Sequence, residues 1–214
     1  MKLRSMALAL GILAAGSAQA DLIDYGNGMV YDNVANLTWL KDANFAMSSG
    51  YDADGLMSWA EAQAWAASLT VGGVSGWRLP TVTPVNGSSF NFDYSEDGST
   101  DSGINISGLN SELGHMYYTT LGNSAAGGLT HSGPFSNLQN FAYWSGTAHP
   151  AYADEALHFF TAFGDQGSSP QVSEYYGWAV HSGNVAAVPE PASAALLLAG
   201  LGLLAYRRRP TRRD

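Results

Sequence analysis

The stretch from Val188 to Arg209 limits most strongly what this chain can fold into. It begins with Pro189, Glu190 and Pro191, continues with an almost purely apolar run over 192–206, and ends in Arg207, Arg208 and Arg209. The two prolines stop any helix that would enter from the preceding domain. The apolar run has no polar face, so it does not suit a surface helix of a globular domain. We therefore expect residues 188–214 to form a separate segment that inserts into a membrane.

The length and flanks of this segment indicate how it would meet a bilayer. Its 15 apolar residues reach about 22 Å as an α-helix, short of the roughly 30 Å hydrocarbon core, so residues 185–188 or a thinned bilayer would close the gap. The basic end stays cytoplasmic. The order of Pro-Glu-Pro, apolar helix and basic end resembles the PEP-CTERM sorting signal of Gram-negative bacteria. That resemblance implies a short transmembrane helix in the inner membrane and a cut near Pro-Glu-Pro by an exosortase; a plain C-terminal anchor is the alternative.

The N-terminus has the three parts of a secretory signal peptide. Lys2 and Arg4 are basic, residues 6–15 are apolar, and residues 18–20 form an Ala-Gln-Ala cleavage site. We expect export by the Sec route, a cut after Ala20 by signal peptidase, and a final place at the cell surface or outside the cell. Between the two signals lies one domain, residues 21–187, long enough to bury about 70% of its unfolded surface.

This domain is strongly acidic. Residues 21–189 contain 16 carboxylates against Lys41 and Arg78, a formal charge of −14. Nucleic-acid binding is excluded because it requires a basic surface, and sulfated or uronic polymers are repelled unless a cation bridges them. The charge suits solubility alone or the collection of divalent ions. The chain has no cysteine, so thiol catalysis and thiolate metal sites are excluded.

Local patterns predict a mixed α+β domain. Residues 29–32 and 37–40 are expected to form a hairpin. Ser58 and Glu61 form a capping box that opens a helix with an apolar stripe, and Gly72-Gly73 is expected to end it. The remaining expectations are a second helical region at 106–121, strands at 141–144, 156–163 and 176–180, and polar loops at 88–103, 122–133 and 164–175.

Longer motifs resemble a known family. They are LTWLKDAN at 37–44, SWAEAQAWAASL at 58–69 and GWRLPT at 76–81, with further matches at 112–118, 133–136, 143–146 and 178–180. Together they resemble the DUF1566 family, related to the C-terminal domain of the Legionella collagen-like adhesin. The resemblance covers nearly all of residues 28–185. It implies a single C-type-lectin-like domain, in which a hairpin joins the termini beside two helices and a looped-out second sheet.

Arg78 is one of the two cations of the acidic domain and lies between Trp77 and Leu79. A guanidinium that is partly buried needs a carboxylate partner. We therefore predict a structural ion pair for Arg78, with ligand binding as the alternative.

The loop at 88–103 contains a candidate calcium site. Asp93, Ser95, Asp97 and Asp101 place oxygens at positions 1, 3, 5 and 9 of a calcium loop, and Gly98 occupies position 6. Position 12 is Ile104 instead of a bidentate glutamate, so other segments would have to complete the shell. A solvated acidic loop without an ion is the alternative.

Other sequence features leave the chemistry open. The five histidines lack metal-site spacing, so zinc would need tertiary proximity, and no nucleophile elbow or phosphate-binding loop is present. A pair of carboxylates for glycoside hydrolysis remains an alternative, because the 16 acids of the domain allow many combinations. Aromatic side chains can stack on sugars, or they can fill the core. The tyrosines to inspect are Tyr117, Tyr118, Tyr143, Tyr175 and Tyr176.

The leading hypothesis is an exported, exosortase-sorted binding module without enzymatic activity, which recognises carbohydrate with the help of calcium. A second hypothesis is a hydrolase of matrix polysaccharide, which requires two carboxylates that face each other across a cleft. A third is a purely structural matrix protein, which would lack a concave site.

Overall fold

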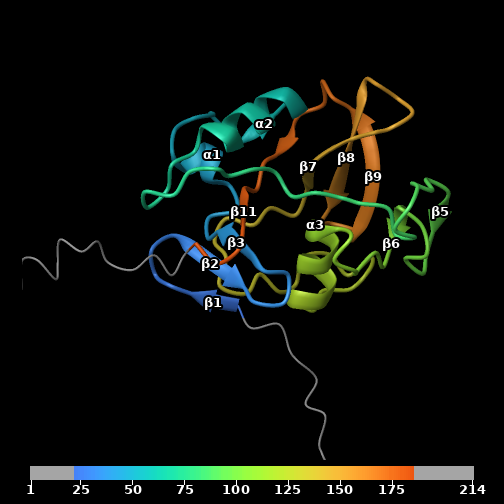
Figure 1. The fold of residues 1–214 in the computed structure, drawn as a ribbon, viewed down its shortest axis with the longest axis horizontal. Coiled ribbons are helices and arrows are strands. Elements are labelled where there is room, and N and C mark those ends of the chain that lie inside the picture. Colours follow the sequence, from blue (N-terminus) through green and yellow to red (C-terminus); the bar gives the residue numbers. More distant parts are fainter. Residues whose placement is uncertain (1–21, 186–214) are drawn as a thin grey trace, which may run out of the picture.

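The structure is a computed structural model that describes residues 22–185 of the 214-residue chain. Strands dominate it and helices are few and short, so the α+β class is confirmed (Figure 1). The predicted signal peptide at 1–20 and the apolar sorting helix within 188–214 lie outside the described residues. Between residues 22 and 185, none of the helices combines the length and apolarity that a bilayer crossing requires.

The first sheet has four strands in the order β1-β2-β3-β11. Their bounds are β1 Leu22–Asp24, β2 Met29–Asp32, β3 Leu37–Leu40 and β11 Val180–Ser182. All neighbours are antiparallel, and β2 and β3 form the predicted hairpin, which is confirmed. The Thr38 hydroxyl donates to the carbonyl of Gly183 at 2.7 Å and accepts from the amide of Val185 at 3.1 Å. This sheet therefore holds both ends of the described chain.

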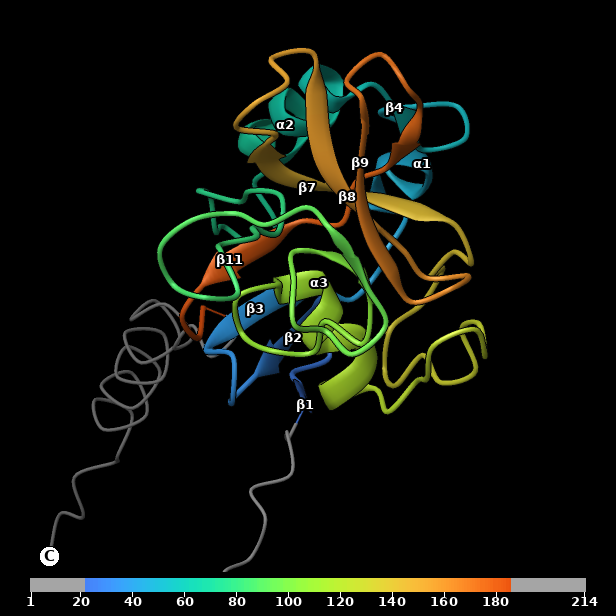
Figure 2. The same ribbon diagram turned by 90° about the vertical axis from the view of Figure 1, so that its right-hand side faces the viewer.

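The second sheet has seven strands in the order β4-β10-β7-β8-β9-β6-β5. Their bounds are β4 Leu56–Met57, β5 Tyr94–Ser95, β6 Ser102–Ile104, β7 Ala142–Ala148, β8 Glu155–Phe160, β9 Asp165–Pro170 and β10 Tyr175–Tyr176. In Figure 2, β8 and β9 face the viewer, and no helix lies in front of them. The two pairs β5–β6 and β7–β10 are parallel, and the other pairs are antiparallel.

Two predictions about the C-terminal half are wrong. The expected loop at 164–175 contains β9, which pairs with β8 in unbroken register from Asp165 to Pro170. Its glycine and serine residues give no apolar alternation in the sequence, and the strand is defined by its backbone pairing with β8. The expected strand at 176–180 is divided, because the chain crosses from the second sheet to the first at Gly177. A Cβ there would lie 2.8 Å from Trp65, so only glycine allows this crossing.

Helix α2, Trp59–Ser68, begins with the predicted capping box, which is confirmed. The amide of Ser58 donates to Glu61 at 3.0 Å, and the Ser58 hydroxyl accepts from the amide of Glu61. The helix ends at Ser68, earlier than the predicted glycines, because Leu69 is already extended. The short helix α1, Phe45–Ser48, precedes it.

The predicted second helical region is shorter than expected. It consists of α3, Glu112–Gly114, followed directly by η1, a π-helical turn over His115–Thr120. At Gly114 a Cβ would lie 2.1 Å from the carbonyl oxygen of Ile106. Glycine is therefore required here, because the turn packs directly on the backbone that leads into it.

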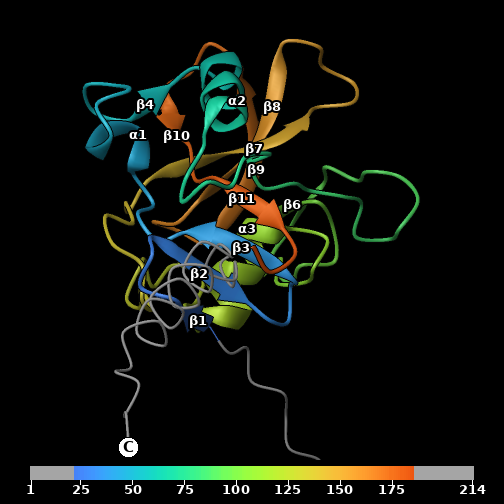
Figure 3. The same cartoon turned by 60° about the vertical axis from the view of Figure 1, so that its left-hand side comes forward.

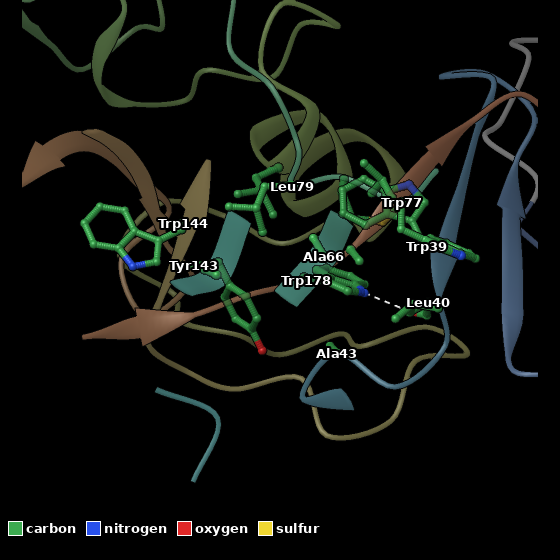
Figure 4. Packing of buried hydrophobic residues seen from close by; sticks show 14 of the residues in the cluster. Trp39, Leu40, Ala43, Ala66, Trp77, Leu79, Tyr143, Trp144 and Trp178 are labelled. Atoms are coloured by element: carbon green, nitrogen blue, oxygen red, sulfur yellow. Dashed lines mark hydrogen bonds between the residues drawn. The ribbon is translucent and has the colours of Figure 1, made fainter. Parts of the chain in front are cut away.

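The core joins the two sheets and α2, and tryptophans form its centre (Figure 4). Trp39 of β3 and Trp178, just before β11, pack with ring centroids 4.5 Å apart. The Trp178 indole donates to the carbonyl of Leu40 at 2.8 Å, and the Trp144 indole of β7 donates to that of Met57 at 2.8 Å. The indoles of Trp178 and Trp144 are therefore satisfied by strand backbone on burial, whereas the buried indole N–H of Trp39 has no hydrogen-bond partner.

Candidate binding surface

Arg78 forms the predicted structural ion pair, which is confirmed. Its backbone exchanges two hydrogen bonds with Val180 of β11, at 2.8 and 2.9 Å. Its Nη1 and Nη2 donate to the two carboxylate oxygens of Glu112 at 2.7 and 2.8 Å, a two-pronged pair. The amide of Thr81 donates to the same carboxylate at 2.7 Å. The pair therefore ties the segment around Arg78 to the first turn of α3.

A groove of about 460 Å³ opens beside this ion pair. One side is an exposed face of α2, and the other is the segment that contains Arg78. The lining residues are Gln63, Ala64, Ala67, Trp77, Arg78, Leu79, Thr81 and Gly146. Apolar lining with a few polar groups at its rim is the usual composition of a ligand site. None of the eight lining residues is a carboxylate.

The four predicted calcium residues have other partners. Asp101 is buried, and its two carboxylate oxygens accept from the amides of Val85 and Asn91, both at 2.7 Å. Asp97 accepts from the amide of Ser99 at 3.0 Å, and hydrogen bonding by Ser99 lowers the pKa of the Asp97 carboxyl.

The other two calcium candidates contact Thr100. Its hydroxyl lies 2.9 Å from the Ser95 hydroxyl and donates to the backbone carbonyl of Asp93 at 2.6 Å. Within residues 22–185, no three His, Cys, Asp or Glu side chains are grouped so that they could hold a metal ion. The structure therefore does not gather Asp93, Asp97 and Asp101, and calcium binding stays a prediction.

The tyrosines chosen from the sequence separate into two groups. Tyr117 and Tyr143 are buried in the core, and burial raises the pKa of both hydroxyls. Tyr118 is half-buried, and its hydroxyl donates to the carbonyl of Gly164 at 2.5 Å. Tyr175 and Tyr176 are half-buried on β10. The core interpretation is therefore correct for Tyr117 and Tyr143.

An aromatic stack that the sequence analysis missed lies on two loops that follow, along the chain, two segments of the groove lining. It consists of Phe90, Phe92, His149 and Tyr152. Successive ring centroids are 5.3, 4.1 and 4.7 Å apart, with interplanar angles of 11°, 31° and 27°. Two loops distant in sequence supply these rings, so no local period could reveal the stack. The only signal is the pair of phenylalanines in an otherwise polar loop.

The groove and the aromatic stack share the same supporting segments. Gly146 in the groove wall donates to the carbonyl of Pro80 at 2.7 Å. The Thr147 hydroxyl accepts from the amide of Val82 at 2.9 Å and donates to its carbonyl at 3.1 Å. Figure 3 shows the green connection after residue 82 reaching away from the two sheets. One backbone hydrogen bond and two made by the Thr147 hydroxyl thus fix the segment that leads to the phenylalanines against the segment that leads to His149.

Comparison with known proteins confirms both resemblances found in the sequence. Residues 28–181, well over half of the chain, match the model of the Lcl C-terminal domain. Residues 187–213 match the model of the PEP-CTERM protein-sorting motif, which marks the chain as an exported protein sorted by an exosortase. No curated protein and no solved structure matches the chain. The chain therefore belongs to the Lcl C-terminal domain family and carries a PEP-CTERM protein-sorting motif.

Proposed function

We propose that this protein is a non-enzymatic, lectin-like module of the cell surface or extracellular matrix, and that it binds polysaccharide in the groove beside α2. The groove is the observation that carries the proposal. Its apolar lining includes Ala64, Ala67 and Leu79, and its polar groups come from Gln63, Arg78 and Thr81. A sugar ring presents an apolar C–H face ringed by hydroxyls, which this combination complements. The sheet that holds both ends of the described residues supports the lectin-like description.

The charge of the domain favours a neutral polysaccharide. Both basic residues between 22 and 185 already have carboxylate partners: Lys41 lies 2.7 Å from Asp24, and Arg78 lies 2.7 Å from Glu112. A strongly acidic surface with paired cations repels sulfated and uronic polymers. A neutral chain meets no such barrier.

The absence of a carboxylate from the groove lining favours binding over hydrolysis. A glycosidase needs two carboxyl groups about 5–10 Å apart that flank the sugar bond. No lining residue supplies one. Glu112, the carboxylate nearest in the ion-pair network, accepts from Arg78 and from the amide of Thr81. The purely structural alternative lacks support for a different reason, because it gives the groove no role.

A glycan array with blocked variants tests the proposal. Ala64 and Ala67 are exposed on α2, so Ala64→Trp and Ala67→Trp would fill the groove and leave the fold intact. Ala60→Trp is the matched control, because Ala60 is exposed on the same helix outside the lining. We expect binding of at least one neutral glycan, lost in the two blocked variants and retained in the control. A wild-type domain that binds no glycan would overturn the proposal and leave a structural role.

Intact mass of the protein recovered after export tests the sorting separately. We expect a chain that starts at Asp21 and ends near Pro189, without the apolar run and the arginines. Recovery of a chain that retains residues 192–209 would make it an ordinary membrane-anchored protein.

A further inference from the structure

The aromatic stack is not part of the hydrophobic core. Phe90, Phe92 and Tyr152 are absent from the buried cluster that joins the two sheets. They lie on two loops, and Tyr152 is 59% exposed. Clustered apolar surface that does not serve the core is a mark of an interaction site. The stack therefore calls for an explanation other than folding.

The loop that supplies the two phenylalanines is fixed by hydrogen bonds to the buried carboxylate of Asp101. Asp101 is 1% exposed, and it accepts amide hydrogens from Val85 and Asn91, both at 2.7 Å. Asn91 lies between Phe90 and Phe92 in the chain, so Asp101 fixes the backbone that carries both rings. A buried carboxylate with both oxygens satisfied makes this loop a rigid support.

The second loop is held by His149. Its ring lies within stacking distance of both Phe92 and Tyr152. Its Nδ1 accepts from the amides of Ala151 and Tyr152, at 3.2 and 3.1 Å. One buried side chain thus joins the two loops and sets the position of the exposed Tyr152 ring. Such preorganisation reduces the ordering cost of binding.

We propose that the aromatic stack is a second sugar subsite, at which the exposed Tyr152 ring packs against a pyranose ring of the same neutral polysaccharide chain that occupies the groove. This inference rests on the proposed function. A polymer fits because the groove and the stack stand on the same two segments, joined through Gly146, Thr147 and Val82. A neutral polymer fits because no lysine or arginine belongs to the stack, and Arg78 in the groove is already paired with Glu112.

Chain length provides the test. The probes are fluorescently labelled neutral glucan, mannan and galactan oligosaccharides of two to ten sugars, titrated against the wild-type domain and variants. Tyr152→Ala removes the outer ring, and Tyr152→Phe keeps it. Tyr51→Ala is the control, because Tyr51 is a similarly exposed tyrosine, at 53%, outside both features.

We expect long oligosaccharides to bind more tightly than short ones. Tyr152→Ala should remove about threefold to tenfold of affinity for long chains, as expected for one aromatic contact, and leave the shortest bound chain unaffected. Tyr152→Phe and Tyr51→Ala should behave as wild type.

Three other outcomes decide against the inference in different ways. Unchanged long-chain binding in Tyr152→Ala overturns the second subsite, while loss of binding in Ala64→Trp still upholds the groove. Equal loss for short and long chains in Tyr152→Ala overturns the two-subsite arrangement. Wild-type protein that binds none of these sugars overturns the inference and the proposed function together; a protein ligand captured through Tyr152 would then explain the stack instead.

Discussion

The two basic residues of the described domain form ion pairs of very different kinds. Arg78 holds Glu112 with two parallel hydrogen bonds, and although Arg78 is 34% exposed, the Glu112 side chain is only 13% exposed. Lys41 holds Asp24 with one contact, and both side chains are about one-third exposed. The first pair connects α3 to the segment beside β11, whereas the second lies on the rim of the four-stranded sheet. Two ion pairs of the same formal charge are therefore expected to contribute differently to the stability of the fold.

The difference follows from solvent. At the rim, water screens Lys41 and Asp24, and both keep much of their hydration whether or not they meet. Around Arg78, the carboxylate has lost its water, so its remaining partners are the guanidinium and the amide of Thr81. Loss of one partner there leaves a dehydrated charge, which is expensive.

Removal of the Arg78 cation from the mostly buried Glu112 should have the largest effect. Arg78→Met leaves Glu112 without its main partner, and we expect a loss of about 3 kcal/mol in the free energy of unfolding, at the low end for a buried pair because the guanidinium itself is 34% exposed. Urea unfolding with an unchanged m-value would measure it. The double variant with Glu112→Gln should recover part of the loss, because the unpaired charge is gone. A single variant as stable as wild type would remove the contrast between the two ion pairs.

Acid should affect the interior next most strongly, through His158. This side chain is packed among Trp144, Phe160 and Tyr175, and burial lowers its pKa to about 4. The unfolded chain takes up the proton first, near pH 6.5, so stability should fall as pH drops from about 6.5 to about 4. The full loss is on the order of 3 kcal/mol.

Thermal melts across this pH range would measure that loss, and a His158→Gln variant should melt with a flatter pH dependence. The rim offers the contrasting case. Lys41 lowers the pKa of Asp24, so the contribution of Asp24 is present above its unfolded pKa and is lost only as pH falls through its lower folded value. A wild-type profile that is flat between pH 6.5 and 4 would contradict burial of a neutral His158.

Asp101 should show that an interior carboxylate matters even without a cation. In Asp101→Asn, one amide N–H of the loop would face the new side-chain NH₂ instead of an oxygen, and we expect a loss of about 1–3 kcal/mol. Asp97→Asn in the same loop is the control, since that side chain lies at the surface. Both variants can be compared by chemical denaturation. Equal stability of the two would place Asp101 among the surface carboxylates.

Lys41→Ala should have a smaller effect. We expect a change of at most about 1 kcal/mol, and less at high salt, because the pair is solvated. Unfolding at low and at molar salt would measure it. A loss as large as that of Arg78→Met would erase the distinction between rim and interior.

Calcium provides the last comparison, between the exposed acids of the 88–103 loop and the buried Asp101. If Asp93, Ser95, Asp97 and Asp101 bind the ion as predicted from their spacing, millimolar calcium should raise the melting temperature relative to chelator. An unchanged melting temperature would count against the site. The Asp93→Asn variant should lose any calcium-dependent rise.

Interactions between residues close together in the chain could be predicted from the sequence. The capping box at Ser58 and Glu61 joins groups three residues apart, and the hairpin at 29–40 needs only a turn between two apolar strands. The need of Arg78 for a carboxylate follows from burial alone. Its partner could not be named, because Glu112 is 34 residues away and 15 other acids of the domain were equal candidates.

Long-range pairing was not readable. Strand β9 can be identified only from its pairing with β8 in the structure, because its glycine and serine residues give no apolar alternation in the sequence. The crossing at Gly177 depends on how close Trp65 lies, and the aromatic stack depends on loops that meet across the fold.

The sequence by itself determined the C-terminal sorting motif, the family, the acidic charge and the local caps and turns. These depend on composition and on neighbours within a few residues. Only the tertiary structure decided which carboxylate holds Arg78, which aromatic rings reach the surface, and where a groove opens. Those features arise where distant segments exclude water together, and no short window of sequence contains both sides of such a contact.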